Sequence, residues 1–121
     1  MSNINFEELC EIAEDEVAMI VKVLPDGVKE QAEGCPVSYE SKPAPDDGLD
    51  EDILVLFEGA SLIDEPGPDA MPRIRIFVEN LWGYTERDEQ DFRDEVGTTY
   101  LHELGHYLGW DEDEIADRGL E

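Results

Sequence analysis

The stretch 102–106 carries the residues best suited to chemistry, because it reads His-Glu-Leu-Gly-His and holds the chain's only two histidines. Residues four apart on a helix lie above one another on the same face. His102 and His106 could therefore bind one metal ion through their imidazole nitrogens. Glu103, about 100° further round the helix, could reach a water molecule bound to that metal. The spacing predicts a zinc centre with Glu103 as general base; the alternative is two solvated or helix-capping histidines.

The third protein ligand of such a centre must be of another residue type, since no third histidine remains. A catalytic zinc ion takes three protein ligands and one water. One arrangement draws a glutamate from a second helix well downstream, but only 15 residues follow His106. The other turns the chain at a glycine just after the helix, and Gly109 suits such a turn. Glu112 is therefore the first candidate, with Asp113 and Asp111 as alternatives, and a carboxylate suits zinc.

The chain is strongly acidic, with 33 Asp and Glu against 8 Lys and Arg and a net charge of −25. This charge argues against binding nucleic acid or an anionic membrane through a basic patch. The favoured explanation is solubility in a high-salt cytoplasm, because the acids are spread along the whole chain. Mimicry of nucleic-acid charge, to occupy a basic partner, is the alternative. The acidity also raises the local cation concentration, which favours metal capture.

Length and composition indicate one globular domain spanning residues 1–121, with 40% hydrophobic residues. No apolar run reaches 18 residues, and the segment 1–9 lacks the pattern of a signal peptide. We therefore expect a cytoplasmic monomer. Cys10 and Cys35 should be reduced and act as small buried apolar residues.

Four segments before residue 80 have the residue patterns of regular structure. A helix is predicted over 5–24, capped by Asn5 or Asn3 and stopped by 25–27, whereas 28–31 is ambiguous. A weak strand is predicted over 37–40, then a loop over 42–52 and a strand buried on both faces over 53–57. The alternation over 73–79 predicts a half-exposed strand, with Arg73 and Arg75 on its polar face.

A second helix is predicted from Thr85, as N-cap, to Leu108, with Gly109 ending it. Apolar residues should anchor this helix while the histidines face a cleft. One predicted stripe of the helix contains Leu101, Leu104 and Leu108, and another contains Phe92, Val96, Thr99 and Glu103. Gly97, unfavourable in mid-helix, indicates close approach of another element. A short helix is expected over 112–118.

Taken together, the motifs resemble those of the minimal zincin-like metallopeptidases, over roughly residues 5–118. The stretch 102–112 matches the zincin pattern H-E-x-x-H-x-x-G-x-x-(D/E/H), although an aspartate usually stands in that family where this chain has Glu112. Residues 54–59 with Leu62, residues 73–77 and residues 95–106 resemble further segments of the family. The resemblance implies an α+β fold: an N-terminal helix, a small mixed sheet of about 3–4 strands, the active-site helix and a short C-terminal helix.

The resemblance also implies a zinc-dependent peptidase in which Glu103 takes a proton from water and passes it to the leaving amine. A peptide substrate would pair with an edge strand beside the active-site helix, for which 73–79 is the candidate. Tyr100 or Tyr107 could stabilise an oxyanion, but packing is the expected role of both, as it is of Trp82 and Trp110. The alternatives are a zinc-binding domain without catalysis and an acidic interaction protein with a structural metal.

Overall fold

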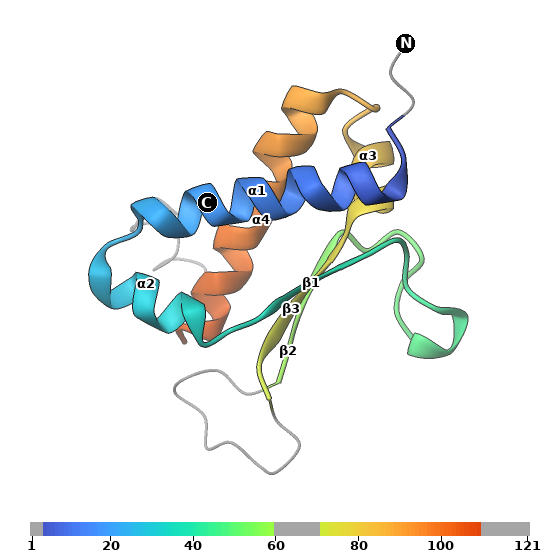
Figure 1. Cartoon of the computed structure of the whole chain (residues 1–121). Helices are drawn as coiled ribbons and strands as arrows, with labels where there is room; N and C mark the ends of the chain where they lie inside the picture. Colours follow the sequence, from blue (N-terminus) through green and yellow to red (C-terminus); the bar gives the residue numbers. More distant parts are fainter. Residues whose placement is uncertain (1–3, 60–70, 110–121) are drawn as a thin grey trace.

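The computed structural model describes residues 4–59 and 71–109. Its helices and small mixed sheet confirm the predicted α+β class (Figure 1). The predicted helix over 112–118 lies outside the described residues. The elements in chain order are α1 (Phe6–Val23), α2 (Asp26–Glu33), β1 (Val37–Glu40), the 3-10 turn η1 (Pro45–Asp47), β2 (Val55–Glu58), β3 (Arg73–Phe77), α3 (Val78–Tyr84) and α4 (Glu89–Tyr107).

The sheet has the order β1-β3-β2, so β3 is its central strand among the described residues. β3 runs parallel to β1, with Ile74 opposite Val37, and antiparallel to β2, with Ile76 opposite Val55. Helices α1 and α4 cross on one side of the sheet, and the segment containing η1 lies on the other (Figure 1). The prediction that 73–79 is an edge strand is therefore wrong, and β2 is the edge strand that contacts α4.

Arg75 explains why the sequence does not predict the central position of β3. An arginine in a strand is expected to face solvent, but the side chain of Arg75 is only 7% exposed. Its guanidinium bonds to Glu40 at 2.8 Å and to Asp47 at 3.1 Å, and lies 3.5 Å from Glu58. It also stands over the ring of Phe77, 5.2 Å from the ring centroid. Hydrogen bonding to Arg75 lowers the pKa of the Glu40 carboxyl. These carboxylates make burial of a charge on the central strand tolerable.

The ends of both predicted strands shift in the structure. β3 stops at Phe77, which is buried, and Val78 already begins the helix α3, which the alternating pattern did not predict. β2 covers Val55–Glu58 and is half-buried throughout, whereas the sequence predicted burial on both faces. An edge strand with helix α4 beside it has this intermediate burial. The Asn80 side chain of α3 donates to the carbonyls of Glu51 and Ile53, which holds the approach to β2 in place.

Helix α1 is capped as predicted, because the side chain of Asn5 accepts the N–H of Glu8 at 2.8 Å. This helix ends at Val23, just before 25–27, as predicted, but helical structure resumes at Asp26, so the ambiguous stretch 28–31 lies inside α2. Pro25 explains why there are two helices instead of one. It lacks an N–H to continue α1, yet its fixed φ, −54° here, suits the start of α2.

Helix α4 begins later than predicted. Its N-cap is Asp88, whose side chain accepts the N–H of Asp91 at 2.9 Å, whereas Thr85 caps the end of α3 and donates to the carbonyl of Leu81. Glu86 and Arg87 separate the two helices with left-handed φ values of 57° and 60°. Two consecutive residues in that region cannot continue a right-handed helix, so Thr85 cannot start α4.

The core lies between α1, α4 and the sheet. Gly97 of α4 meets α1 there: a Cβ on this glycine would stand 3.0 Å from Cδ1 of Ile20, which confirms the predicted close approach. Cys35 is buried as predicted, while Cys10 is only half-buried. Among the described helices, none combines the length and the apolar character that crossing a membrane requires.

Candidate metal centre

The C-terminal half of α4 is fixed by a stripe of buried residues that recur every three or four positions. Only Leu104 of the three predicted leucines is fully buried; Leu101 and Leu108 are half-buried against the core. The anchoring stripe instead contains Phe92, Val96, Tyr100, Leu104 and Tyr107. His102, Glu103 and His106 are half-buried beside it. The helix therefore presents its polar triplet at the border of the core, where a side chain is both positioned and accessible.

The three side chains of this triplet lie together. The possible ligand atoms of His102, Glu103 and His106 are all within 4.8 Å of one another. The two imidazole rings have centroids 4.8 Å apart and planes at 77°. Two nitrogens bound to one zinc ion can be at most about 4.2 Å apart, since each bond is about 2.0–2.1 Å. Small side-chain rotations would therefore bring the donors round one ion, and imidazole and carboxylate donors suit zinc.

The carboxylate of Glu103 is held between the sheet and a histidine. Oε1 accepts the backbone N–H of Phe57, on the edge strand β2, at 3.1 Å. Oε2 lies 3.8 Å from Nε2 of His106. The Glu103 side chain is 13% exposed, against 36% for His106, so the carboxylate is the more enclosed of the two. One oxygen is thus bound to the strand while the other lies beside the imidazole of His106.

The pairing of β2 with β3 explains why the Phe57 N–H points to Glu103. Phe77 donates to the carbonyl of Leu54 at 3.0 Å, so these two residues form a hydrogen-bonded pair. Hydrogen-bonded and non-hydrogen-bonded pairs alternate along an antiparallel ladder. Val55 and Phe57 are then in non-bonded pairs with Ile76 and Ile74, and their own N–H and C=O groups face the outer edge of β2. No pattern of residues could have predicted this contact, because a backbone group makes it.

The tyrosines on α4 have packing roles. Tyr100 is 1% exposed and Tyr107 5% exposed, and burial raises the pKa of Tyr100 to about 12 and also raises the pKa of Tyr107. The Tyr107 ring packs against Phe57, with centroids 5.9 Å apart. Trp82 is also buried and meets Phe92 edge to face at 5.7 Å. Trp110 lies outside the described residues.

The chain turns just after His106, as the third-ligand argument requires. Leu108 caps α4, and Gly109 follows with a left-handed φ of 84°. The N–H of Gly109 donates to the carbonyl of His106 at 3.0 Å. Glycine adopts this conformation without a Cβ penalty and commonly stands just past a helix end. The candidate ligands Glu112, Asp113 and Asp111 lie outside the described residues and stay predictions.

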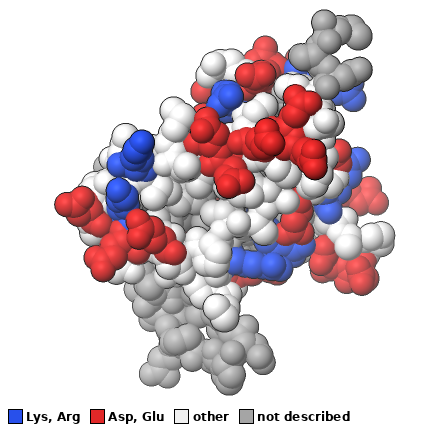
Figure 2. Space-filling view, viewed as in Figure 1, with Lys and Arg blue, Asp and Glu red and all other residues white. Residues whose placement is uncertain are grey.

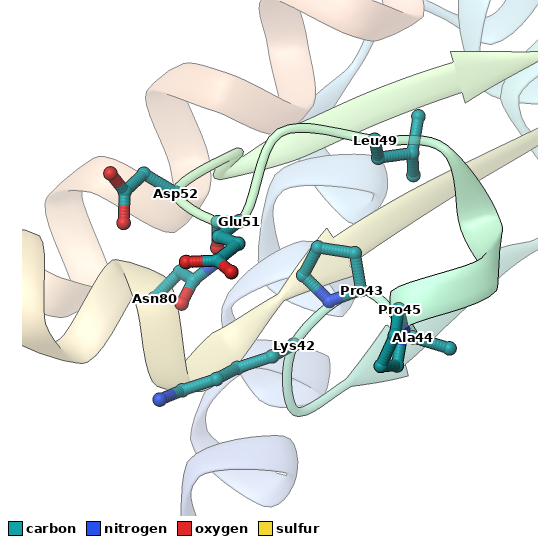
Figure 3. Close-up of a pocket in the computed structure, with 8 residues that line it drawn as sticks. All are labelled: Lys42, Pro43, Ala44, Pro45, Leu49, Glu51, Asp52 and Asn80. Carbon is teal, nitrogen blue, oxygen red and sulfur yellow. The ribbon is translucent and has the colours of Figure 1, made fainter.

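The polar cavity shown in Figure 3 is separate from the triplet. Its volume is about 510 Å³, and its lining residues come from the 42–52 segment and from Asn80 of α3. None of them belongs to the triplet. On the face shown in Figure 2, acidic side chains lie on several separate parts of the surface, with basic ones scattered among them. The cavity is therefore not part of the candidate metal centre, whose residues lie on α4 beside β2.

Comparison with known proteins assigns the chain to a family. The model of the zincin-like metallopeptidase family matches residues 32–120, well over half of the chain. The chain therefore belongs to the zincin-like metallopeptidases, as its motifs predicted. The match includes the whole triplet, the three strands and Gly109. A search of curated proteins found no match.

Proposed function

We propose that this protein is a zinc-dependent peptidase in which His102 and His106 hold the metal and Glu103 is the general base. The observation that supports this most is the placement of the Glu103 carboxylate, with one oxygen on the edge strand and the other beside His106. Zinc, when bound, lowers the pKa of a coordinated water and polarises a substrate carbonyl. Membership of the zincin-like family supports the same metal and the same class of reaction.

The protein residues have separate tasks in this proposal. Oε2 of Glu103 accepts a proton from the attacking water, and the same carboxyl later delivers it to the nitrogen of the departing amine. A carboxylate beyond Gly109, with Glu112 as the first candidate and Asp113 or Asp111 as alternatives, completes the ligand set. The peptide substrate pairs with the outer edge of β2. The strand β3, which the sequence predicted for this role, is central in the sheet.

The experiment that tests this proposal measures zinc content and peptide cleavage in the same samples. Wild-type protein should bind about one zinc per chain and cleave unfolded protein or a fluorogenic peptide library. Glu103→Ala should keep the zinc and lose at least about 100-fold in kcat, because the general base is gone. Glu95→Ala, which removes another half-buried glutamate of α4, is the matched control and should change neither quantity.

Metal analysis separates the ligands from the base. His102→Ala should lose zinc, and among Glu112→Ala, Asp113→Ala and Asp111→Ala only the variant of the true third ligand should do so. Full cleavage by Glu103→Ala would contradict the proposal. Zinc binding without any cleavage by the wild type would instead support a zincin-like domain that binds metal and has no turnover.

A further inference from the structure

We propose that the backbone N–H of Phe57 is a positioning group for Glu103, and that this contact also sets where a bound peptide stops pairing with β2. The inference concerns the same site and rests on the proposed peptidase function for its catalytic part. Its structural part stands on the 3.1 Å contact between the Phe57 nitrogen and Oε1 of Glu103. Val55 and Phe57 are the residues of β2 whose backbone groups face outward, by the register with β3.

The contact fixes the direction of the carboxylate. A glutamate side chain has three rotatable bonds, and a hydrogen bond to the carboxylate narrows the set of rotamers that it samples. Anchoring Oε1 on a backbone group of the sheet leaves Oε2 toward Nε2 of His106, at 3.8 Å. Hydrogen bonds to ionised carboxylates are among the stronger ones. The edge strand therefore orients the general base as well as offering a surface for the substrate.

The same contact limits how a peptide can add to β2. An antiparallel partner exchanges two hydrogen bonds with each residue in a bonded pair. Within residues 4–59 and 71–109, the outward-facing N–H and C=O of Val55 are available to such a partner, whereas the N–H of Phe57 is taken by Glu103. The substrate residue opposite Phe57 can donate to the Phe57 carbonyl, but its own carbonyl has no strand N–H to bind. That carbonyl is left beside Glu103, which places the bond to be cleaved at the level of Phe57.

Amide hydrogen exchange of the metal-free protein tests the contact without any need for zinc or turnover. Val55 serves as internal reference, because its N–H faces the same edge. In Glu103→Ala the N–H of Phe57 should exchange at least about 10-fold faster than in wild type, as expected when a hydrogen bond to a charged group is lost. The rate at Val55 should not change. Equal Phe57 rates in the two proteins would overturn the inference.

Kinetics of zinc-loaded variants test the catalytic part. Phe57→Pro removes the N–H at an outward-facing edge position, where proline breaks no bond to β3, and Phe57→Ala is the control that loses the ring but keeps the N–H. Relative to that control, Phe57→Pro should lower kcat by about 10–100-fold and change KM by less than about 3-fold. Val55→Pro should instead raise KM, since it removes a substrate contact that exists before the reaction.

Two further measurements keep these outcomes separate. Zinc content and circular dichroism of each proline variant show whether it has folded, and replacing the Phe57 amide by an ester, with the side chain kept, gives a second test if Phe57→Pro has not. Equal kcat values for Phe57→Pro and Phe57→Ala would overturn the catalytic part. If wild-type protein cleaves no peptide, the proposed function fails, while hydrogen exchange still decides whether Phe57 positions Glu103.

Discussion

Replacing Arg75 by methionine should be among the most destabilising single changes outside the apolar core. Methionine keeps an unbranched side chain over Phe77 but removes the charge that three carboxylates share. Glu40 comes from β1, Asp47 from η1 and Glu58 from β2, so the guanidinium connects both neighbouring strands and the connection between them. Without it, three carboxylates would repel one another on one face of the sheet.

The magnitude follows from the exposure of the groups involved. Removing one partner of a fully buried ion pair costs about 3–5 kcal/mol. The side chain of Arg75 is 7% exposed, but its partners are 28–37% exposed and remain partly hydrated. The discounted loss for Arg75→Met is about 2–4 kcal/mol in the free energy of unfolding. Arg73 provides a matched control: it lies on the same strand and pairs with Glu58 at 2.8 Å, but is 49% exposed. Arg73→Met should cost less than about 1 kcal/mol.

Urea unfolding at several pH values measures both effects. Because Arg75 lowers the pKa of Glu40 in the folded protein, this carboxylate stabilises the fold above its unfolded pKa. That stabilisation is lost as the pH falls through the lowered, folded pKa. The variant lacks the part that Arg75 provides at every pH, so the difference between wild type and Arg75→Met should be largest at neutral pH and shrink in acid. Equal costs for Arg75→Met and Arg73→Met at pH 7 would refute the reasoning.

Three further predictions concern packing, capping and thiol chemistry. Gly97→Val should lower the free energy of unfolding by about 2–4 kcal/mol, measured in urea, because the valine side chain would press on Ile20. Gly97→Ala should change this free energy by less than about 1 kcal/mol, because the higher helix propensity of alanine offsets its contact with Ile20. Asp88→Ala should cost about 0.5–2 kcal/mol through loss of the α4 cap, and Asp88→Ser should recover most of it; no difference between the two would contradict the cap. Burial raises the pKa of Cys35 to about 11, so in the native protein Cys35 should be alkylated more slowly than Cys10 at pH 8. The alkylation rate of Cys35, followed by mass spectrometry, should rise up to about pH 11. Equal rates for the two cysteines would count against burial of Cys35.

The sequence predicted those features best that depend on a single local signal. The spacing of His102 and His106, the cap at Asn5 and the turn at Gly109 each follow from local geometry, and the structure shows the histidines on one helix, the predicted cap and the left-handed glycine. Helix α4 was predicted from its apolar period, but not its start. Thr85 and Asp88 are both good caps, and only the backbone at Glu86 and Arg87 decides between them.

The errors arose where long-range pairing overrides a local pattern. Arg75 makes β3 look half-exposed, although carboxylates from neighbouring elements allow its burial. A strand's place in a sheet cannot be read from its own residues, so the alternating pattern of 73–79 wrongly predicts an edge strand. The partner of Glu103 was missed for the same reason, since the Phe57 N–H becomes available only through the register of β2 with β3.

The outer side of β2 also bears on how copies of this chain avoid one another at high concentration. An unpaired strand edge is a template on which other chains can add and aggregate. β2 is only four residues long, and Glu58 ends it with a charge. The Glu103 carboxylate covers the Phe57 N–H, so a second copy adding at this edge would find one of its ladder positions blocked. The edge that we propose for peptide binding is thereby made a poor site for self-association.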